Sequence, residues 1–539
     1  MELSRFFLPY KNVVLNEYVK NGSHPYYHYP LKNPIGDEER IRELESRKFP
    51  RKEVTRHIRQ YMKRFSISKN VEKSLIKLER KDSVVVIGGQ QAGLLTGPLY
   101  TIYKMMTIVL LAKEKEARLR IPVVPIFWVA GEDHDFLEIN HVYVEEEHIL
   151  KKKQYNDDSY HVKHIVSKRQ LDHARLRKWY EELIQIFGET EYSKHLLSFY
   201  NRQLTKAETY TDFFVAISNE LFQNYGLLFV DSSQLELRKI ESPYFISMIE
   251  KGEEIGEALK NRQQKMLEQG WEKVIHTDEN CFHLFYEMDG IRHLLYTTKE
   301  GNVYSANGKI FSKDELIELA RSNPEYFSNN VVTRPLMQEL LFPTIAFVAG
   351  PGEMQYWAEL KEVFERLNLR IPPIVPRLTI TLLERNLERE LKELGLQVDR
   401  VLMEGTKEEK KKALEMLKDQ NLLSYFEKGK KEVEWTYQQT IRRIIEFDKG
   451  LEGIVKKNEQ LILQQFLFLE KKVEEIMERK HSVLLTKYDR IENHLFPFGR
   501  FQERCWNISY FFNKYGMDLI DRLMELPFEI NGYHYIVKL

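Results

Sequence analysis

Four consecutive ionisable residues, Glu132–Asp135, follow closely after the apolar run at residues 123–127. A run of this kind is typical of a buried parallel strand, so its polar continuation should lie at the edge of a sheet where ligands bind. Charges gathered at such a rim cost free energy unless they serve a ligand. We therefore expect His134 or Asp133 to act as the general base that removes a proton from an attacking amine.

Three further residues, Asp135, Asn140 and His141, are expected to orient the substrate or the base. Two other interpretations stay open. Asp135 could simply cap a helix over residues 136–142. His134 and His141 with nearby carboxylates could bind a divalent metal, but histidines seven residues apart are a weak signal, and we predict no metal site.

A glycine-rich stretch at residues 88–104 follows another apolar run, 84–87. Pro98 can open a helix there, and the free backbone amides of a helix start attract phosphate or carboxylate. Neither common phosphate-binding fingerprint is present, and a tight strand-to-helix connection is the plain alternative. The candidate substrate- or nucleotide-binding residues of this stretch are Gly88, Gln90, Gln91, Gly93, Thr96, Gly97, Tyr100 and Lys104.

A third apolar run ends in Gly350-Pro-Gly-Glu353, so the same logic predicts ligand contacts there. Two arginines nearby could clamp a carboxylate or phosphate, although each alone suits an ordinary salt bridge. Polar residues near the C-terminus could line the same pocket or pack between helices. The candidates from these segments are Gly350, Gly352, Glu353, Tyr356, Trp357, Arg334, Arg377, Gln502, Arg504 and Asn507.

These strand ends require a parallel sheet, and we predict an α/β, Rossmann-like core built from residues 1–144 and 330–379. Residues 145–329 interrupt it as an inserted connecting domain. Within them, alternating segments on either side of Asp289-Gly290 predict a β-hairpin. Such an insertion could cover the site.

Residues 380–485 are strongly helical in pattern. Val455, Ile462, Leu469 and Ile476 recur every seven residues and predict a coiled-coil hairpin, within one chain or between two, with a homodimer preferred. Gly450 and Gly453 are interpreted as a kink in the upstream part. The C-terminal segment, 486–539, should return to the core and end in a hairpin around Asn531-Gly532.

Bulk composition narrows the function classes. The chain has 539 residues, and 81 Lys and Arg balance 81 Asp and Glu, which argues against nucleic acid as a partner. No apolar run reaches membrane-spanning length and no secretory signal is evident, so we expect no membrane association and a cytoplasmic protein. The only cysteines, Cys281 and Cys505, cannot form a multi-cysteine zinc site or a disulfide framework, and no zinc is expected.

Taken together, four motifs resemble one family over essentially the whole chain. They are Gly-Gly-Gln-Gln-Ala-Gly-Leu-x-Thr-Gly-Pro-Leu-Tyr-Thr at 88–101, Gly-Glu-Asp-His-Asp-Phe-x-Glu-Ile-Asn-His at 131–141, Gly-Pro-Gly-Glu at 350–353 and Gln-Glu-Arg at 502–504. The sequence is similar in these motifs to the cysteine-adding ligases of bacillithiol biosynthesis.

That resemblance implies an enzyme that joins L-cysteine to the glucosamine amine of malyl glucosamine. It also implies a fold similar to the core of class I aminoacyl-tRNA synthetases, with a coiled coil that pairs two subunits. The short His-x-Gly-His and Lys-Met-Ser-Lys-Ser signatures of those synthetases are absent. Activation of cysteine by ATP, with ADP or ATP and Mg²⁺ bound, is the simplest expectation for such a fold.

Two alternatives belong to other classes. A nucleotide-binding scaffold or regulatory protein could assemble partners through the coiled coil, but it would not need the acidic cluster of Glu132–Asp135. An RNA-linked aminoacylating enzyme follows from fold analogy alone, and the zero net charge speaks against it.

Overall fold

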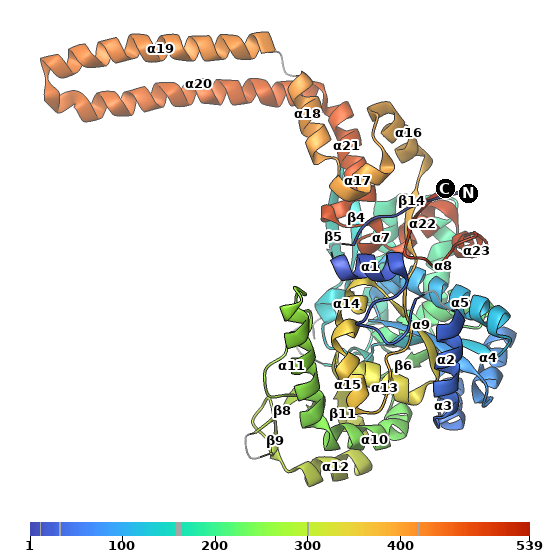
Figure 1. Cartoon of the computed structure of the whole chain (residues 1–539). Helices are drawn as coiled ribbons and strands as arrows, with labels where there is room; N and C mark the ends of the chain where they lie inside the picture. The colour runs from blue at the N-terminus through green and yellow to red at the C-terminus, as the bar shows by residue number, and fades with distance from the viewer. Residues whose placement is uncertain (11, 32–33, 158–163, 299–300, 418–419) are drawn as a thin grey trace. The chain divides into compact units, whose positions relative to one another are not determined.

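The computed structural model describes the chain from Met1 to Leu539 except residues 11, 32–33, 158–163, 299–300 and 418–419 (Figure 1). The chain divides into two compact units. The first, the core unit, comprises Met1–Glu146, Leu150–Leu382 and Gln502–Leu539. The second, the helical unit, comprises Glu147–Ile149 and Leu383–Phe501.

A five-stranded parallel sheet forms the centre of the core unit, with strand order β13-β12-β2-β3-β6. The predicted Rossmann-like α/β core is therefore confirmed. The strands are β2 (Val84–Gln90), β3 (Val123–Val129), β6 (Leu228–Asp231), β12 (Thr344–Ala349) and β13 (Ile374–Pro376).

The continuous apolar sequence of these strands follows from burial on both faces. Helix α5 (Leu99–Leu119) packs along β2, β3 and β12, while α3 (Arg51–Met62) and α4 (Lys69–Glu79) pack on β6. The chain runs outward from β2 to β3 and β6, then returns to build β12 and β13 on the other side of β2. This reversal between β2 and β12 is the position where open α/β sheets bind ligands.

The prediction of an insertion at 145–329 overlooked one core strand. Strand β6, Leu228–Asp231, pairs in parallel with β3 and completes the central sheet. A run of four residues is too short to be distinguished from a helix fragment by periodicity. Apart from residues 147–149, the whole segment belongs to the core unit rather than to a separate compact unit.

The predicted hairpin at Asp289-Gly290 is confirmed. Strand β7 (Cys281–Met288) pairs antiparallel with β8 (Ile291–Thr297), and both central turn residues have positive φ. These strands belong to a second sheet of order β10-β9-β8-β7-β11. Its other members are β9 (Val303–Ser305), β10 (Ile310–Phe311) and β11 (Phe327–Asn329).

The predicted C-terminal hairpin is wrong. Only β15 (His534–Lys538) forms, and it lies between β1 (Glu2–Phe6) and β14 (Thr379–Leu383) in a three-stranded sheet. The Asn531 side chain accepts a hydrogen bond from the Tyr533 amide at 3.0 Å, so Asn531-Gly532 makes a turn into β15 rather than a turn between two strands.

The remaining elements of the core unit are mostly helices. They are α1 (Val13–Asn21), α2 (Pro34–Glu45), α3 (Arg51–Met62), α4 (Lys69–Glu79), α6 (Phe136–Ile139), α7 (His173–Phe187), α8 (Ser193–Leu204), α9 (Tyr210–Phe222), α10 (Leu235–Glu250), α11 (Gly252–Glu268), α12 (Lys313–Ser322), α13 (Thr333–Leu341), α14 (Pro351–Glu359), α15 (Lys361–Arg366), α22 (Ile508–Tyr515) and α23 (Leu519–Met524), with the strand pair β4 (His141–Glu146) and β5 (Ile149–Gln154).

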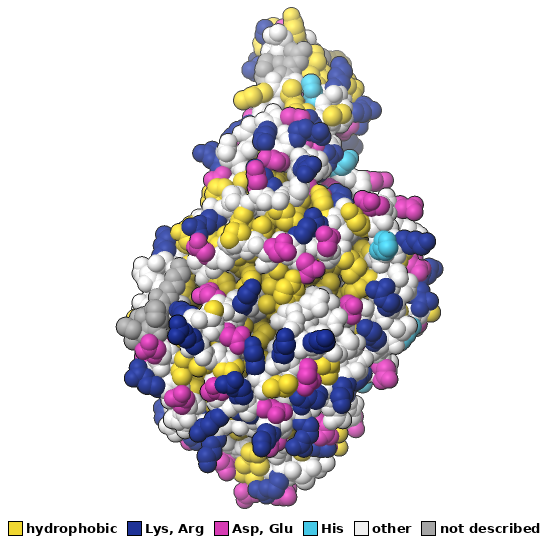
Figure 2. Space-filling model, turned by 90° about the vertical axis from the view of Figure 1, so that its right-hand side faces the viewer, with side chains coloured by type: hydrophobic (Ala, Val, Ile, Leu, Met, Phe, Trp, Pro, Cys, Tyr) yellow, Lys and Arg dark blue, Asp and Glu magenta, His cyan; other side chains and the backbone are white. Residues whose placement is uncertain are grey.

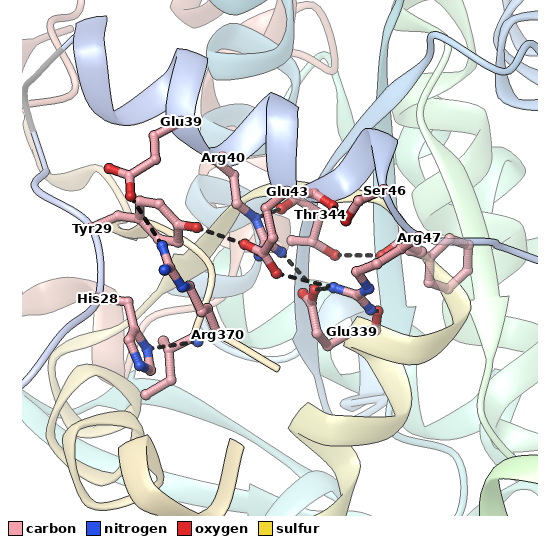
Figure 3. Close-up of polar contacts among 12 residues, drawn as sticks. His28, Tyr29, Glu39, Arg40, Glu43, Ser46, Arg47, Glu339, Thr344 and Arg370 are labelled. Carbon is pink, nitrogen blue, oxygen red and sulfur yellow. Dashed lines mark hydrogen bonds and ion pairs between the residues drawn. The ribbon is translucent and has the colours of Figure 1, made fainter. Parts of the chain in front are cut away.

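A buried network of charges fastens α2 to the edge of the central sheet (Figure 3). Arg40 is fully buried, and its guanidinium donates to Glu339 of α13 at 2.6 Å and to the Thr344 carbonyl of β12 at 3.0 Å. Arg47 pairs with the same Glu339 carboxylate. One oxygen of Glu339 thus accepts from two arginines, so its negative charge is paired inside the protein.

Within the helical unit, α16 (Arg385–Leu394), α17 (Val398–Glu404) and α18 (Lys407–Leu417) pack against α21 (Ser482–Leu495). Leu387 and Leu391 of α16, four residues apart on one helix face, are buried.

Helices α19 (Gln420–Phe447) and α20 (Glu452–Lys480) form an antiparallel hairpin (Figure 1). The predicted hairpin is confirmed, but the kink is wrong, because Gly450 lies in the short connection Lys449–Leu451 and Gly453 in the first turn of α20.

The seven-residue register on α20 holds only at its beginning. Val455 is buried and Ile462 is half-buried, whereas Leu469 and Ile476 are 53% and 44% exposed. An unsupercoiled helix turns every 3.6 residues, so a stripe with period 3.5 drifts off the contact line. Phe466 and Val473, which lie between these positions on the helix, are both half-buried.

Charged side chains of both signs are intermingled on the face drawn in Figure 2, in keeping with the balance of 81 basic and 81 acidic residues. Among the described residues, no helix combines the length and the apolar character needed to cross a membrane.

Candidate active site

A cavity of about 610 Å³ opens at the carboxyl ends of β2, β3 and β12, at the reversal in strand order. All three predicted strand ends contribute to it, so the prediction that they converge is confirmed. The predicted residues that line it are Gln90, Gln91, Tyr100, Lys104, Asp133, His134, Asp135, Arg334, Gly350, Gly352, Glu353, Tyr356, Arg377 and Arg504.

His134 lies between two carboxylates on one side of the cavity. Its Nδ1 is 4.0 Å from Asp133 and its Nε2 is 3.8 Å from Asp135. The ring also meets the edge of Phe285, with centroids 6.5 Å apart. Nδ1 is buried and has no hydrogen-bond partner among the described residues. The imidazole can therefore accept a proton and be stabilised by both acids once it is charged.

Asp133 is held in place by donors. One of its oxygens accepts the His134 backbone amide at 2.7 Å, and the other accepts the Gln91 side chain at 2.6 Å. These two hydrogen bonds hold the Asp133 carboxylate in place, and the His134 ring beside it lines the cavity.

Two arginines also line the cavity, Arg334 at the start of α13 and Arg504 in the C-terminal segment. The Arg334 guanidinium donates to the Tyr356 hydroxyl at 2.5 Å, while its Nε is buried and has no partner in the described part of the chain. Burial raises the pKa of Tyr356 to about 12, so the phenol stays neutral and Arg334 keeps its full charge. Arg504 is exposed at the cavity wall.

Lys104 is fully engaged by the protein. Its ammonium donates to the Gly89 carbonyl at 2.7 Å and to Gln90 at 3.2 Å, and it pairs with Glu353. Burial lowers its pKa, and Glu353 opposes that shift. Glu353 also accepts the Gly350 amide at 2.8 Å, which caps α14. Lys104 thus joins the ends of β2 and β12 rather than reaching freely into the cavity.

A second internal pair fixes the C-terminal segment to the site. Arg377 donates both guanidinium nitrogens to Glu503, at 2.7 and 2.5 Å, and both side chains are buried. Its guanidinium carbon lies 5.5 Å from the centre of the Tyr100 ring. Arg377 is therefore neutralised within the protein, and its bond to Glu503 holds the segment that carries Arg504.

The predicted anion site at the start of α5 is wrong. The Leu99 amide donates to the Trp506 carbonyl at 2.8 Å, and the Asn507 side chain donates to the carbonyls of Leu95 and Gly97 at 3.0 and 2.6 Å. The C-terminal segment thus covers this helix start. Gly93, Thr96 and Gly97 do not line the cavity and instead form the tight connection that was the alternative prediction.

Other predicted site residues also lie away from the cavity, each with a structural explanation. A Cβ at Gly88 would sit 2.8 Å from the Val348 carbonyl, so glycine is needed for strand packing. The Gln502 side chain bonds both backbone groups of Leu382, and the Asn140 side chain donates to the Tyr155 carbonyl. Trp357 packs against Phe347 and Phe364 in the core, and His141 packs against Tyr143.

Sequence reasoning missed the part of the cavity wall that the second sheet supplies. These residues follow no strand of the central sheet, and only the hairpin signal at Asp289-Gly290 pointed to their region. They are His276, Thr277, Phe285, Arg292, Leu294, Asn329, Asn330 and Val331.

No group of three or more metal-ligating side chains occurs among the described residues. Cys281 and Cys505 are both buried, and burial raises the pKa of the Cys281 thiol to about 11. Neither cysteine lines the cavity.

Two models of one known protein family together match almost the whole chain. The family model described as "Bacillithiol biosynthesis BshC, N-terminal Rossmann-like domain" matches residues 1–378, and the "C-terminal coiled-coil domain" of the same family matches residues 380–539. The chain belongs to the BshC family. The resemblance inferred from the strand-end motifs is confirmed.

Individual members of the BshC family are similar in sequence to this chain over 93% to 100% of its length. A Geobacillus sp. (strain WCH70) protein named "Putative cysteine ligase BshC" is 40% identical over 542 residues, covering 100% of both chains. Proteins with the same name from Bacillus cereus (strain AH187) and Anoxybacillus flavithermus (strain DSM 21510 / WK1) are 40% and 39% identical, over 93% and 100% of each chain.

Proposed function

We propose that this protein is a ligase that forms an amide between the carboxyl group of L-cysteine and the glucosamine amine of malyl glucosamine. The observation that carries the proposal is that one cavity holds both kinds of group. His134 with its two flanking carboxylates lines it, and so do Arg334 and Arg504. Amide formation needs both a proton acceptor for the amine and positive charge near the activated carboxyl group.

In this proposal the amine approaches from the side of His134. A glucosamine ammonium must lose a proton before its nitrogen can attack a carbonyl carbon, and the His134 imidazole lines the cavity with 23% of its side chain exposed. Asp133 and Asp135, 4.0 and 3.8 Å from the ring nitrogens, then place negative charge beside the imidazolium that forms.

The carboxyl group of cysteine is activated by ATP in the same proposal. A cysteine carboxylate oxygen attacks the α-phosphorus and pyrophosphate leaves; the amine then attacks the carbonyl carbon and AMP leaves. Arg334 and Arg504 would face the phosphate charge. Mg²⁺ usually needs one or two carboxylates plus phosphate oxygens, so Asp133 and Asp135 could serve a Mg²⁺-nucleotide even though no all-protein metal cluster occurs among the described residues.

A homodimer through the coiled coil completes the proposal. Helix α20 carries a second apolar stripe besides the one that faces α19, and its members are Ile454, Leu461, Phe468, Leu469 and Ile476, each at least 44% exposed. At 100° per residue these positions span an arc of roughly 100°, the width of a helix-packing face. A second copy of α20 would bury that stripe.

The catalytic assignment is tested with His134→Ala and Asp135→Ala combined in one protein. Product, followed by mass spectrometry, should fall at least about 100-fold, in line with loss of a general base. The melting temperature should hardly change, because Asp135 is 60% exposed and His134 is 23% exposed. Full turnover in a correctly folded double variant would refute the assignment.

A further inference from the structure

A second, smaller cavity lies between α11 and residues 273–279, the segment that leads into β7. Its volume is about 210 Å³. Pockets for drug-sized ligands usually measure roughly 300 to 1,000 Å³, so a ligand of this cavity would be a small molecule. One wall is a single face of α11, because Gly256, Lys260 and Gln263 recur at helical spacing. We call it the α11 cavity.

His283 of β7 directs a buried hydrogen-bond donor into the α11 cavity. The side chain lines the cavity although the residue is only 2% exposed. Its Nδ1 lies 3.2 Å from Asn330 Nδ2. The Asn330 Oδ1 already accepts the Val332 and Thr333 amides, so Nδ2 is the donor to His283 and the ring proton lies on Nε2. Nε2 faces Gly256 and has no hydrogen-bond partner among the described residues.

Positive charge lies next to this donor. Burial and then the charge of Lys260 lower the pKa of His283 to about 4, so the ring is neutral at pH 7. Lys260 and Lys273 both line the α11 cavity, and neither forms a salt bridge in the part of the chain that the structure describes. An N–H donor beside an ammonium group suits a carboxylate, because charge-assisted hydrogen bonds are the strong ones.

Negative charge lines another part of the same cavity. Asp278 and Glu279 contribute there, and Glu279 has no ion-pair partner among the residues described. Neither acid affects the pKa of His283. Asp278 acts instead on Tyr296 of β8, whose pKa is raised by burial and then by Asp278. The cavity therefore offers one positive and one negative end to a small ligand.

We propose that the α11 cavity is an effector site for a small α-amino acid bound as a zwitterion. Its carboxylate accepts hydrogen bonds from His283 Nε2 and Lys260, and its ammonium group faces Asp278 and Glu279. A simple anion or cation would meet like charge at one end, whereas a dipolar ion is attracted at both. None of these four residues lines the cavity at the carboxyl ends of β2, β3 and β12.

Two contacts connect this site to the candidate active site. Thr277 lines both cavities. His283 is bonded to Asn330, which lines the active-site cavity and holds the first backbone amides of α13. A ligand on Nε2 would fix the ring and, through Asn330, the start of the helix that carries Arg334. Resting on the proposed function, occupancy should therefore change the KM for malyl glucosamine.

The first test is calorimetry with L-alanine as the probe. The wild type should bind it, and Lys260→Gln and Glu279→Gln should each bind it about 10-fold or more weakly, because a hydrogen bond to a charged group is worth at least that factor. Propionate lacks the ammonium group and ethylamine lacks the carboxylate, so each should also bind more weakly than alanine. No binding of alanine by the wild type, or propionate binding as tightly as alanine, would overturn the zwitterion site.

A pair of substitutions at His283 tests the donor itself. Asn tolerates the positive φ of 61° at this position and offers Asn330 an acceptor in place of Nδ1, but it lacks the Nε2 donor. His283→Asn should therefore weaken alanine binding about 10-fold or more. His283→Gln, whose longer amide reaches the position of Nε2, should restore part of it. Melting temperatures confirm that both variants fold, and wild-type affinity in His283→Asn would overturn the role of Nε2.

Two further variants show where alanine binds. Lys265→Gln is the matched control on α11, because Lys265 is 60% exposed, pairs with Glu362 and does not line the cavity. It should bind alanine as the wild type does, and a loss equal to that of Lys260→Gln would overturn a specific site. Arg334→Met, in the active-site cavity, should also keep its alanine affinity. Loss of binding there, with Lys260→Gln unaffected, would assign the alanine to the active-site cavity instead.

The connection between the two cavities has its own readout. Saturating alanine should change the KM for malyl glucosamine in the wild type and leave it unchanged in Lys260→Gln. An unchanged KM in a wild-type protein that binds alanine would overturn the connection. If no amide forms under any condition, yet alanine binds to the wild type and not to Lys260→Gln, the proposed function fails and the amino-acid site stands.

Discussion

The core unit and the α19–α20 hairpin use charge in opposite ways. In the core unit, arginines are buried against carboxylates, as in the Arg40–Glu339 pair, where the side chains are 0% and 1% exposed. On the hairpin, pairs such as Lys456–Glu452 are more than half exposed, and apolar residues such as Phe468 lie in solvent. Buried pairs fix the geometry around the cavity, whereas the surface of the hairpin is suited to meeting another chain.

The largest expected effect tests whether buried ion pairs stabilise the core unit. Glu339→Gln leaves the guanidinium groups of Arg40 and Arg47 without their shared carboxylate (Figure 3). Breaking a buried pair in this way costs about 3 to 5 kcal/mol of unfolding free energy, measured by denaturant titration. The matched control is Glu318→Gln, whose pair with Arg321 is 66% and 60% exposed, and a comparable loss there would contradict the distinction.

The next effect is a dependence of stability on pH. Burial lowers the pKa of His57 in α3 from 6.5 to about 4. Between those values the unfolded chain binds a proton that the folded protein does not, so the unfolding free energy should fall as the pH falls from 6.5 to about 4, by about 3 kcal/mol for this residue. His57→Gln should remove that part of the slope in chemical denaturation at several pH values. Parallel curves for the two proteins would show that His57 does not contribute.

The exposed stripe of the hairpin predicts an effect on association rather than on folding. Replacing Phe468 and Leu469 by serine removes two apolar side chains that are 58% and 53% exposed. Full burial of such side chains contributes about 1.5 to 3 kcal/mol each. The dissociation constant of the dimer, measured by analytical ultracentrifugation, should therefore rise by at least about 100-fold. A wild-type protein that sediments as a monomer at high concentration would contradict the homodimer.

The smallest effect concerns a single surface ion pair. Lys456→Ala removes an exposed i, i+4 pair with Glu452, whose side chains are 64% and 52% exposed. The change in unfolding free energy should stay below about 0.5 kcal/mol and shrink further in salt. A loss as large as that of Glu339→Gln would erase the difference between the two regions.

The sequence was sufficient for features encoded over short distances. Apolar β-branched runs predicted β2, β3 and β12, because strands buried on both faces lack alternation. The polar residues after them predicted His134 and Glu353 at one sheet edge, because carboxyl ends of parallel strands converge.

Features set by distant contacts could not be predicted in this way. The start of α5 is blocked by the Trp506 carbonyl, more than 400 positions along the chain from Leu99, and no local pattern reports that bond. Arg292 and Asn329 reach the cavity through antiparallel pairing of β7 with β8 and β11. Their roles depend on where that sheet packs, which residue spacing does not encode.

The most direct test of the central claim is mass spectrometry of purified wild-type protein incubated with cysteine and malyl glucosamine, with and without ATP and Mg²⁺. The account predicts the cysteinyl amide only when ATP is present, with AMP and pyrophosphate formed in equal amounts. Formation of the amide without ATP would contradict the activation step. Absence of the amide under both conditions would contradict the proposed ligase function.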